Sequence, residues 1–185
     1  FKNLEMTGFK SFSEKTTILI EKGLTGIVGP NGCGKSNIVE ALRWCMGENS
    51  AKSMRGSGME DVIFSGTSNR PSKNISEVTL LLDNQEKQGS IQYKDFDEIF
   101  VKRKIEKDKG SKYYINDKEV RARDVQTFFA DLSTGAHSPS LISQGRIGQL
   151  VTAKPIERKS ILEEAAGISG IHARRHEAET RLNAA

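Results

Sequence analysis

The apolar and polar positions in the first quarter of the chain predict strands followed by a helix. Residues 1–9 alternate loosely, and residues 16–20 are β-branched and apolar, as is typical of strands. Residues 24–28 form a short apolar run that stops at a Gly-Pro turn, which predicts a buried strand. Apolar residues then recur at helical spacing over 34–46, which predicts an amphipathic helix.

The middle of the chain predicts an antiparallel sheet. Segment 49–68 is polar and rich in glycine, and we expect a loop there with one short strand at 62–64. Further strands are predicted at 78–82, 100–105 and 113–115, separated by polar turns. Strand alternation also places Arg103 on the opposite side of the sheet from Lys102 and Lys104, so these three cations do not form one patch.

The last third of the chain predicts mainly helices. A helix is expected at 123–132 and a loop at 133–140. Pro155 followed by Glu157 is a helix-start signal, because proline suits the first helical position. A narrow apolar seam continues through Ile168, Ile171, Ala178 and Leu182, but it is too short to establish a coiled coil by periodicity.

Composition sets limits on the class of protein. The 185 residues suit one ordinary domain, with 28% charged and 6% aromatic residues. A net charge of +4 permits a nucleic-acid partner, although a solvated mixed surface would give the same balance. Cys33 and Cys45 are the only cysteines, which argues against a zinc site or a disulfide framework and fits a reducing compartment. We expect no membrane span and no signal peptide.

One segment matches the phosphate-loop pattern G-x-x-x-x-G-K-[ST] in full. Its residues are Gly29, Pro30, Asn31, Gly32, Cys33, Gly34, Lys35 and Ser36. Glycines allow consecutive backbone N–H groups to turn toward a phosphate, and the helix that begins here adds its positive end. Lys35 is expected to bring a charge to the β- and γ-phosphates of ATP, and Ser36 a hydroxyl ligand to Mg²⁺. We interpret Cys33 as a small side chain that fits the loop, with a redox role as the alternative.

Five motifs occur in a fixed order along the chain: GFKSF at 8–12, GPNGCGKSNIVEALRW at 29–44, KSMRGSGMEDVIFSG at 52–66, ISQGRIGQLV at 142–151 and ERKSILEEAAGIS at 157–169. Together they resemble the N-terminal half of the ATPase head of bacterial structural-maintenance-of-chromosomes (SMC, condensin-type) proteins. The resemblance covers essentially the whole chain.

This resemblance implies an α/β P-loop NTPase fold of the ABC type. We expect a mixed sheet around the P-loop helix and an antiparallel β subdomain. Residues 1–154 would form the N-terminal lobe of the head, and 155–185 the helical neck and the root of a coiled-coil arm. The aspartate, catalytic glutamate and signature motif that complete such a site would come from a C-terminal half.

The resemblance also implies roles for individual residues. Gln144 matches the glutamine of the glutamine loop, which ligates Mg²⁺ and orients the attacking water. Arg55 matches an arginine that reaches the nucleotide, and Asn37 extends the phosphate-binding segment. Lys10 and Ser11 lie in the GFKSF segment near the nucleotide, with a solvated strand end as the alternative interpretation.

The implied function is ATP-driven engagement of two heads that moves or entraps double-stranded DNA, in chromosome condensation and segregation. The implied partners are the C-terminal half of the head, a second SMC head and kleisin-type subunits. Arg121 and Arg123 match a basic pair that contacts DNA phosphates, while Gly58 stands where a lysine is common. The expected location is the cytoplasm, associated with the nucleoid.

Three alternatives to this function stay open. A transporter cassette would place a signature motif soon after Gln144, and the charged helix at 157–182 argues against it. A coiled-coil DNA-repair ATPase would differ in the sequence beyond residue 185. A non-catalytic scaffold would use the phosphate loop only to sense ATP, and a hydrolysis measurement separates it from an ATPase.

Overall fold

The computed structural model describes residues 1–87, 91–132, 141–166, 175, 179 and 182. The described strands are β1 (Asn3–Thr7), β2 (Thr16–Leu19), β3 (Ile75–Asp83), β4 (Glu98–Glu106), β5 (Gly110–Ile115) and β6 (Lys118–Val120). The described α-helices are α1 (Lys35–Cys45), α2 (Ala122–Asp131), α3 (Arg146–Thr152) and α4 (Pro155–Ala165), and 3-10 turns lie at Met59–Val62 and Ile91–Tyr93.

The six strands form one sheet in the order β2-β1-β3-β4-β5-β6, and each described pair is antiparallel. The antiparallel sheet expected in the middle of the chain is therefore confirmed, and it extends to the N-terminal strands. The mixed sheet expected around the P-loop helix is not formed by the described residues. The β5–β6 connection is a two-residue turn in which Asn116 and Asp117 have φ of 47° and 61°, the conformation that matches the twist of a tight hairpin.

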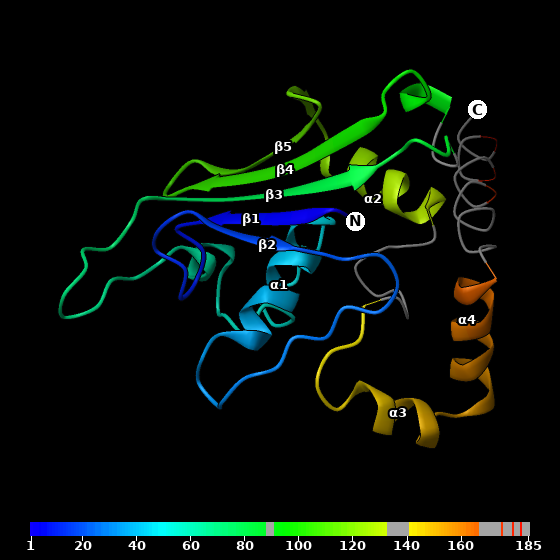
Figure 1. The fold of residues 1–185 in the computed structure, drawn as a ribbon, viewed down its shortest axis with the longest axis horizontal. Coiled ribbons are helices and arrows are strands. Elements are labelled where there is room, and N and C mark those ends of the chain that lie inside the picture. Colours follow the sequence, from blue (N-terminus) through cyan, green and yellow to red (C-terminus); the bar gives the residue numbers. More distant parts are fainter. Residues whose placement is uncertain (88–90, 133–140, 167–174, 176–178, 180–181, 183–185) are drawn as a thin grey trace.

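One face of the sheet carries the core. Alternate residues of the strands are buried there, and α1 packs on β3 and β4 while α2 packs on β5. Figure 1 shows α1 beneath the sheet, with the phosphate loop at the end of α1 that points away from the strands. Phe9 and Trp44 meet with ring centroids 5.5 Å apart, which joins the segment after β1 to α1. The sheet therefore fixes α1, and α1 presents the loop.

Arg103 lies on the side of the sheet opposite Lys102 and Lys104, as the strand alternation predicted, but that side is the buried face and not a solvated one. It is 2% exposed, whereas its neighbours on β4 point to the other face. The guanidinium carbon lies 4.5 Å from the ring centroid of Trp44 and 4.6 Å from that of Tyr113. Its Nη1 donates to the carbonyl oxygens of Trp44 (2.9 Å) and Glu48 (2.6 Å). The cation thus anchors the C-terminal end of α1 to the sheet, and its burial lowers the pKa of Arg103.

The predicted buried strand at 24–28 is wrong for the described structure. This segment has no regular secondary structure, and all of residues 21–30 are exposed. Leu24 is 95% exposed and Val28 is 91% exposed. An apolar run becomes a buried strand only where another strand offers its N–H and C=O groups, and no described strand pairs with this segment.

The predicted short strand at 62–64 is also wrong. Val62 ends a 3-10 turn, and Ile63 makes only an isolated bridge to Phe9. Val62, Ile63 and Phe64 are nevertheless buried. Their apolar character reflects packing under the residues that follow β1, and burial alone does not distinguish a strand from a turn.

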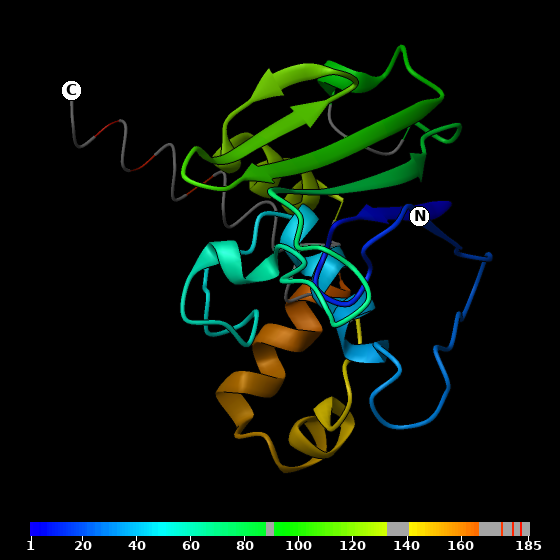
Figure 2. The ribbon, with the colours of Figure 1, turned by 90° about the vertical axis from the view of Figure 1, so that its left-hand side faces the viewer.

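The C-terminal helices lie apart from the sheet, as both views show (Figures 1 and 2). Pro155 begins α4, which confirms the predicted helix start. Within the apolar seam, Ile168, Ile171 and Ala178 lie outside the described residues, and only Leu182 is described, as helical and exposed. The loop predicted at 133–140 also lies outside them. None of the helices in the described part of the chain has the length and hydropathy that a membrane crossing requires.

Candidate functional site

Within the phosphate loop, Gly34 caps the N-terminus of α1. Gly34 has φ of 92°, in the left-handed region that favours glycine. A Cβ atom at this position would lie 3.0 Å from the Ser11 Oγ and 3.4 Å from the Phe12 ring. Both the backbone conformation and the closeness of residues 11 and 12 therefore favour glycine. This close approach brings the GFKSF segment against the first turn of α1.

Lys35 turns back over the phosphate loop. Its Nζ atom donates hydrogen bonds to the carbonyl oxygens of Gly29 at 2.6 Å and Pro30 at 2.5 Å. It also lies 3.9 Å from the Sγ atom of Cys33, whose side chain is exposed. The ammonium group is thus held at the rim of the loop by polar atoms, where an anion can replace a carbonyl oxygen as its partner.

The structure brings residues from three distant segments to one pocket of about 270 Å³. The lining comprises Asn31, Gly32, Gly34, Lys35, Ser36, Asn37, Arg55 and Gln144. Arg55 and Gln144 therefore lie with the phosphate loop, although they are remote from it in sequence. The two charged groups in this lining are both cations, and the first turn of α1 contains no acidic residue. The pocket is suited to an anionic ligand.

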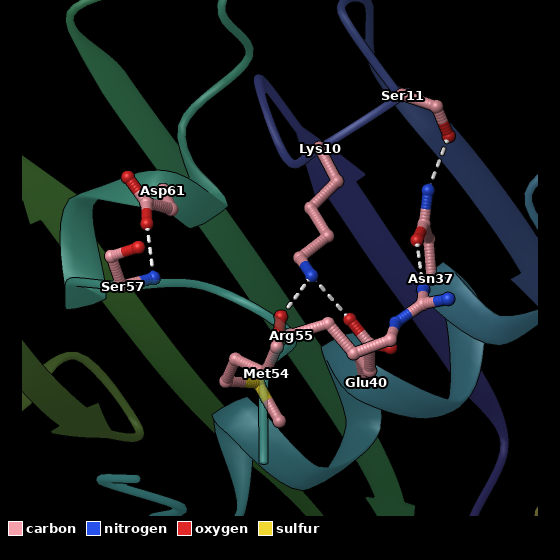
Figure 3. A network of polar contacts seen from close by, with 8 residues as sticks. All are labelled: Lys10, Ser11, Asn37, Glu40, Met54, Arg55, Ser57 and Asp61. Carbon is pink, nitrogen blue, oxygen red and sulfur yellow. Dashed lines mark hydrogen bonds and ion pairs between the residues drawn. The ribbon is translucent and has the colours of Figure 1, made fainter. Parts of the chain in front are cut away.

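Arg55 reaches α1 through two contacts that Figure 3 shows. Its Nε forms an ion pair with Oε1 of Glu40, and its Nη2 donates to Oδ1 of Asn37 at 2.8 Å. Asn37 in turn donates from Nδ2 to the Ser11 Oγ at 2.8 Å. Side chains from 8–12, from α1 and from the 49–58 loop therefore form one continuous polar network beside the pocket.

Lys10 enters the same network from the opposite side. Its Nζ forms an ion pair with Oε2 of Glu40 and donates to the carbonyl oxygen of Met54 (Figure 3). Its backbone N–H donates to the carbonyl oxygen of Val62 at 2.7 Å. Lys10 does not line the pocket, so the structure places it behind the site, whereas Ser11 reaches the pocket residue Asn37.

Asp61 closes the loop that follows Arg55. Its Oδ2 accepts hydrogen bonds from the backbone N–H groups of Ser57 at 2.5 Å and Gly58 at 3.0 Å. These two bonds stabilise the carboxylate, with that from Gly58 the larger cause, and lower the pKa of Asp61. The loop that presents Arg55 is therefore tied at its base by a charged acceptor.

Gln144 is joined to α1 through its neighbour. Arg43 Nη2 donates to the Ser143 Oγ at 3.2 Å, which links the last turn of α1 to the segment that carries Gln144. Gly145 follows with φ of 80°. The side chain of Gln144 is exposed and faces the pocket lining, where an amide oxygen can meet a cation or a water molecule.

The predicted DNA-binding pair lies elsewhere. Arg121 precedes α2, Arg123 is in its first turn, and both are exposed. The Arg121 backbone N–H donates to Asp124 Oδ2 at 2.9 Å. Neither arginine belongs to the pocket lining, so a contact of this pair with DNA phosphates stays a prediction.

Sequence reasoning missed Glu40. Glu40 is 6% exposed and lies on α1, the helix that follows the phosphate loop. Its carboxylate lies between the cations of Lys10 and Arg55, which come from other segments. The signal that could have found it is its spacing: Glu40 precedes the buried Trp44 by one helical turn, and α1 has more apolar residues than one stripe requires. In the described part of the chain, no group of three or more His, Cys, Asp or Glu residues could hold a metal ion.

Comparison with known proteins identifies the family of the chain. Residues 1–145 match the RecF/RecN/SMC N terminal domain family. The Chromosome partition protein Smc of Cereibacter sphaeroides is 58% identical over 184 residues, and the match covers 100% of this chain and 16% of that relative. The chain therefore spans less than a fifth of the length of the curated relative.

Solved structures give the same result. A chain described in connection with ATP-driven dimerization and DNA-stimulated activation of SMC ATPases has a TM-score of 0.73 at 32% identity, covering 89% of this chain and 98% of that one. The SmcHead bound to the C-winged helix domain of ScpA has a TM-score of 0.81 at 32% identity, covering 91% of this chain and 51% of that one. The P-loop NTPase fold of an ATPase head, expected from the sequence, is therefore confirmed.

Proposed function

This chain belongs to the RecF/RecN/SMC N terminal domain family, and from that membership we propose that it is the ATP-binding half of an SMC-type ATPase head. The observation that carries the proposal is that the phosphate loop, Arg55 and Gln144 line one and the same pocket. An ATP molecule bound by this loop would place its phosphates against the positive end of α1. The residues that match the family motifs would then surround the phosphates.

Each proposed role follows from the chemistry of the side chain. Lys35 is proposed to exchange the carbonyl oxygens of Gly29 and Pro30 for phosphate oxygens, which carry more charge. Arg55 is proposed to stabilise the charge that develops on the phosphates, because a guanidinium does not titrate. Gln144 is proposed to orient the attacking water through its amide. The backbone N–H groups of residues 31–37 would hold the remaining phosphate oxygens.

The pocket also fits a magnesium ion in its donor chemistry. Ser36 and Gln144 both line it, and a hydroxyl and an amide oxygen are hard ligands of the kind that Mg²⁺ prefers together with phosphate oxygens. When bound, the ion would neutralise phosphate charge. The chain's own part is to hold these two oxygens on separate segments that meet at the loop.

The partners are proposed from the relatives. Head engagement with a second copy is supported by the ATP-driven dimerization described for one solved neighbour, and a kleisin-type subunit by the ScpA domain bound to another. Double-stranded DNA is the proposed ligand of Arg121 and Arg123, through salt-sensitive phosphate contacts. A C-terminal half would complete the catalytic site. The process served is chromosome condensation and segregation, in the cytoplasm at the nucleoid.

The test of the proposed function is nucleotide binding by the full-length protein that contains this chain. We expect Lys35→Ala to weaken binding of a fluorescent ATP analogue at least about tenfold, because the phosphates lose the ammonium group that pairs with them. The matched control is Lys22→Ala, an exposed lysine of the same region that does not line the pocket. Binding by Lys35→Ala equal to that of the control would contradict the proposal.

A further inference from the structure

Glu40 is a buried carboxylate that the proposed hydrolysis does not use. Its side chain is 7% exposed, and it lies on α1 one turn beyond the phosphate loop. A buried carboxylate is stable as an ion only with charged or hydrogen-bonded partners. Here each oxygen has one: Oε2 pairs with Lys10 and Oε1 with Arg55. The side chain is therefore a bridge between two cations on separate segments.

Lys10 and Arg55 differ in exposure, and this difference indicates which cation holds the Glu40 carboxylate and which cation the carboxylate holds. The Lys10 side chain is 13% exposed and donates a second hydrogen bond to the Met54 carbonyl oxygen, so it is fixed in the interior. The Arg55 side chain is 57% exposed and lines the pocket. Lys10 thus holds the carboxylate in place, and the carboxylate holds the more exposed partner, Arg55, at the edge of the pocket.

Both cationic residues have an unfavourable backbone conformation. Lys10 has φ of 47° and Arg55 has φ of 53°, in the left-handed region that non-glycine residues rarely adopt. Such conformations persist where the surroundings determine them, and they gather at functional sites. The two positions that meet at Glu40 share this conformation although they lie on different loops. The need to direct both side chains toward the Glu40 carboxylate is a sufficient reason for the positive φ at Lys10 and Arg55.

The contacts leave part of Arg55 available. Nε is engaged by Glu40 and Nη2 by Asn37, while Nη1 has no protein acceptor among the described residues. A guanidinium presents its donors in a rigid plane, so fixing Nε and Nη2 also fixes the direction of Nη1. An arginine held by two points on α1 therefore presents its third nitrogen in one orientation relative to the phosphate loop.

We propose that Glu40 is a positioning residue for ATP hydrolysis, which orients Arg55 over the phosphate loop and is itself fixed by Lys10. This inference rests on the proposed function, since it needs ATP in the pocket. Glutamine at this position would offer one acceptor oxygen where two cations need one each. The ligand that Arg55 then meets is the phosphate chain of a nucleoside triphosphate.

The test is a double-mutant cycle in the full-length protein, with kcat and KM for ATP hydrolysis as readouts. The variants are Glu40→Gln, Arg55→Ala and the two combined, and Glu21→Gln serves as an exposed control that does not line the pocket. We expect each single variant to lower kcat about tenfold, the effect of one charge-assisted contact. We expect the combined variant to equal Arg55→Ala, because Glu40 acts only through Arg55.

A merely structural role gives a different result. If Glu40 only stabilises the fold, the combined variant falls below Arg55→Ala by the same factor as Glu40→Gln alone, and the proposal is overturned. A wild-type kcat and KM for Glu40→Gln would overturn it as well. If wild-type protein does not bind the fluorescent ATP analogue, the proposed function fails, whereas binding with additive variants rejects only the role of Glu40.

A second genetic background controls for loss of folding in the Glu40→Gln variant. Glu40→Gln leaves Lys10 as a buried cation without its carboxylate, which can unfold the protein. The same cycle is therefore repeated with Lys10→Met, which together with Glu40→Gln removes both buried charges and keeps the aliphatic volume. Because Lys10 no longer fixes Glu40 in that background, we expect Glu40→Gln to lower kcat by a smaller factor than in the wild-type background, and only while Arg55 is present. An equal loss with and without Arg55 would contradict the proposal.

Discussion

Arg43 donates a hydrogen bond to Ser143 across 100 positions of sequence, at 3.2 Å. The contact joins the helix that follows the phosphate loop to the residue before Gln144. Residues 141 and 142 lead into this segment from a part of the chain outside the described residues. The bond therefore ties the segment that carries Gln144 to α1, and we expect the position of Gln144 to depend on it.

Ser143→Ala tests this dependence. We expect kcat for ATP hydrolysis to fall about fivefold, since a hydrogen bond of about 1 kcal/mol positions Gln144. Binding of the fluorescent ATP analogue should be unchanged, because the phosphate loop is untouched. Ser65→Ala, at an exposed position away from the pocket, is the control. An unchanged kcat would show that Gln144 is positioned without Arg43.

Arg103→Met is expected to destabilise the protein by about 3 kcal/mol. The substitution fills the space but leaves the carbonyl oxygens of Trp44 and Glu48 without the donor that Nη1 supplies. Arg103→Lys should not restore stability, because an ammonium cannot stack between Trp44 and Tyr113 and donate as a fork. Denaturant unfolding followed by the fluorescence of Trp44, the single tryptophan of this chain, measures both.

Lys104→Met is the control for this experiment, since Lys104 lies next to Arg103 on the opposite face of β4. A change within about 0.5 kcal/mol is expected there. Equal stability of Arg103→Met and wild type would mean that the buried cation makes no net contribution.

Two glycines separate backbone strain from steric clash. Gly8 has φ of 63°, and a Cβ atom there would lie 2.3 Å from the carbonyl oxygen of Ile75. Gly23 has φ of 86°, and a Cβ atom there would meet nothing within 4 Å. We expect Gly23→Ala to cost about 1 kcal/mol, from the left-handed conformation alone. Gly8→Ala should cost at least about 2 kcal/mol more, because backbone atoms of two segments must separate. Equal unfolding midpoints for the two variants would exclude the clash.

The two cysteines should differ in reactivity. Burial raises the pKa of Cys45 to about 12, whereas Cys33 is exposed in the phosphate loop. A raised pKa keeps the Cys45 thiol neutral at a pH of about 8, and the thiolate is the reactive form. Iodoacetamide at that pH should therefore alkylate Cys33 in the native protein and Cys45 only after unfolding, as mass spectrometry would show. Alkylation of native Cys45 would contradict its burial, and ATP should slow the reaction at Cys33.

Local sequence patterns predicted the elements whose partners lie within the chain. The helix expected at 34–46 is observed at Lys35–Cys45, and the strands expected at 78–82 and 100–105 are longer in the structure. These elements have a strong period and neighbours that complete them. Residues 24–28 have an equally strong apolar pattern but no described strand beside them, so the pattern did not determine the structure.

The site was predictable in part. The phosphate loop is a contiguous motif, and family motifs pointed to Arg55 and Gln144, which do line the same pocket. Glu40 was not found, because a glutamate in a helix is ordinarily a surface residue. As a buried carboxylate it pairs with Lys10 and Arg55, and both come from other segments. Such a contact depends on the tertiary fold, and its only local mark is the position of Glu40 one helical turn before the buried Trp44.

The strand order has a consequence for how the site is assembled. Met6 on β1 pairs with Val78 on β3, so the chain between these strands forms one large closed loop. That loop contains Lys10, the phosphate segment, all of α1 and Arg55. The entropy lost in joining its ends rises only slowly with its length, and it is lost once for all of these groups. A single strand pairing therefore restricts nearly every part of the pocket together, and among the described lining residues Gln144 alone arrives from outside the closure.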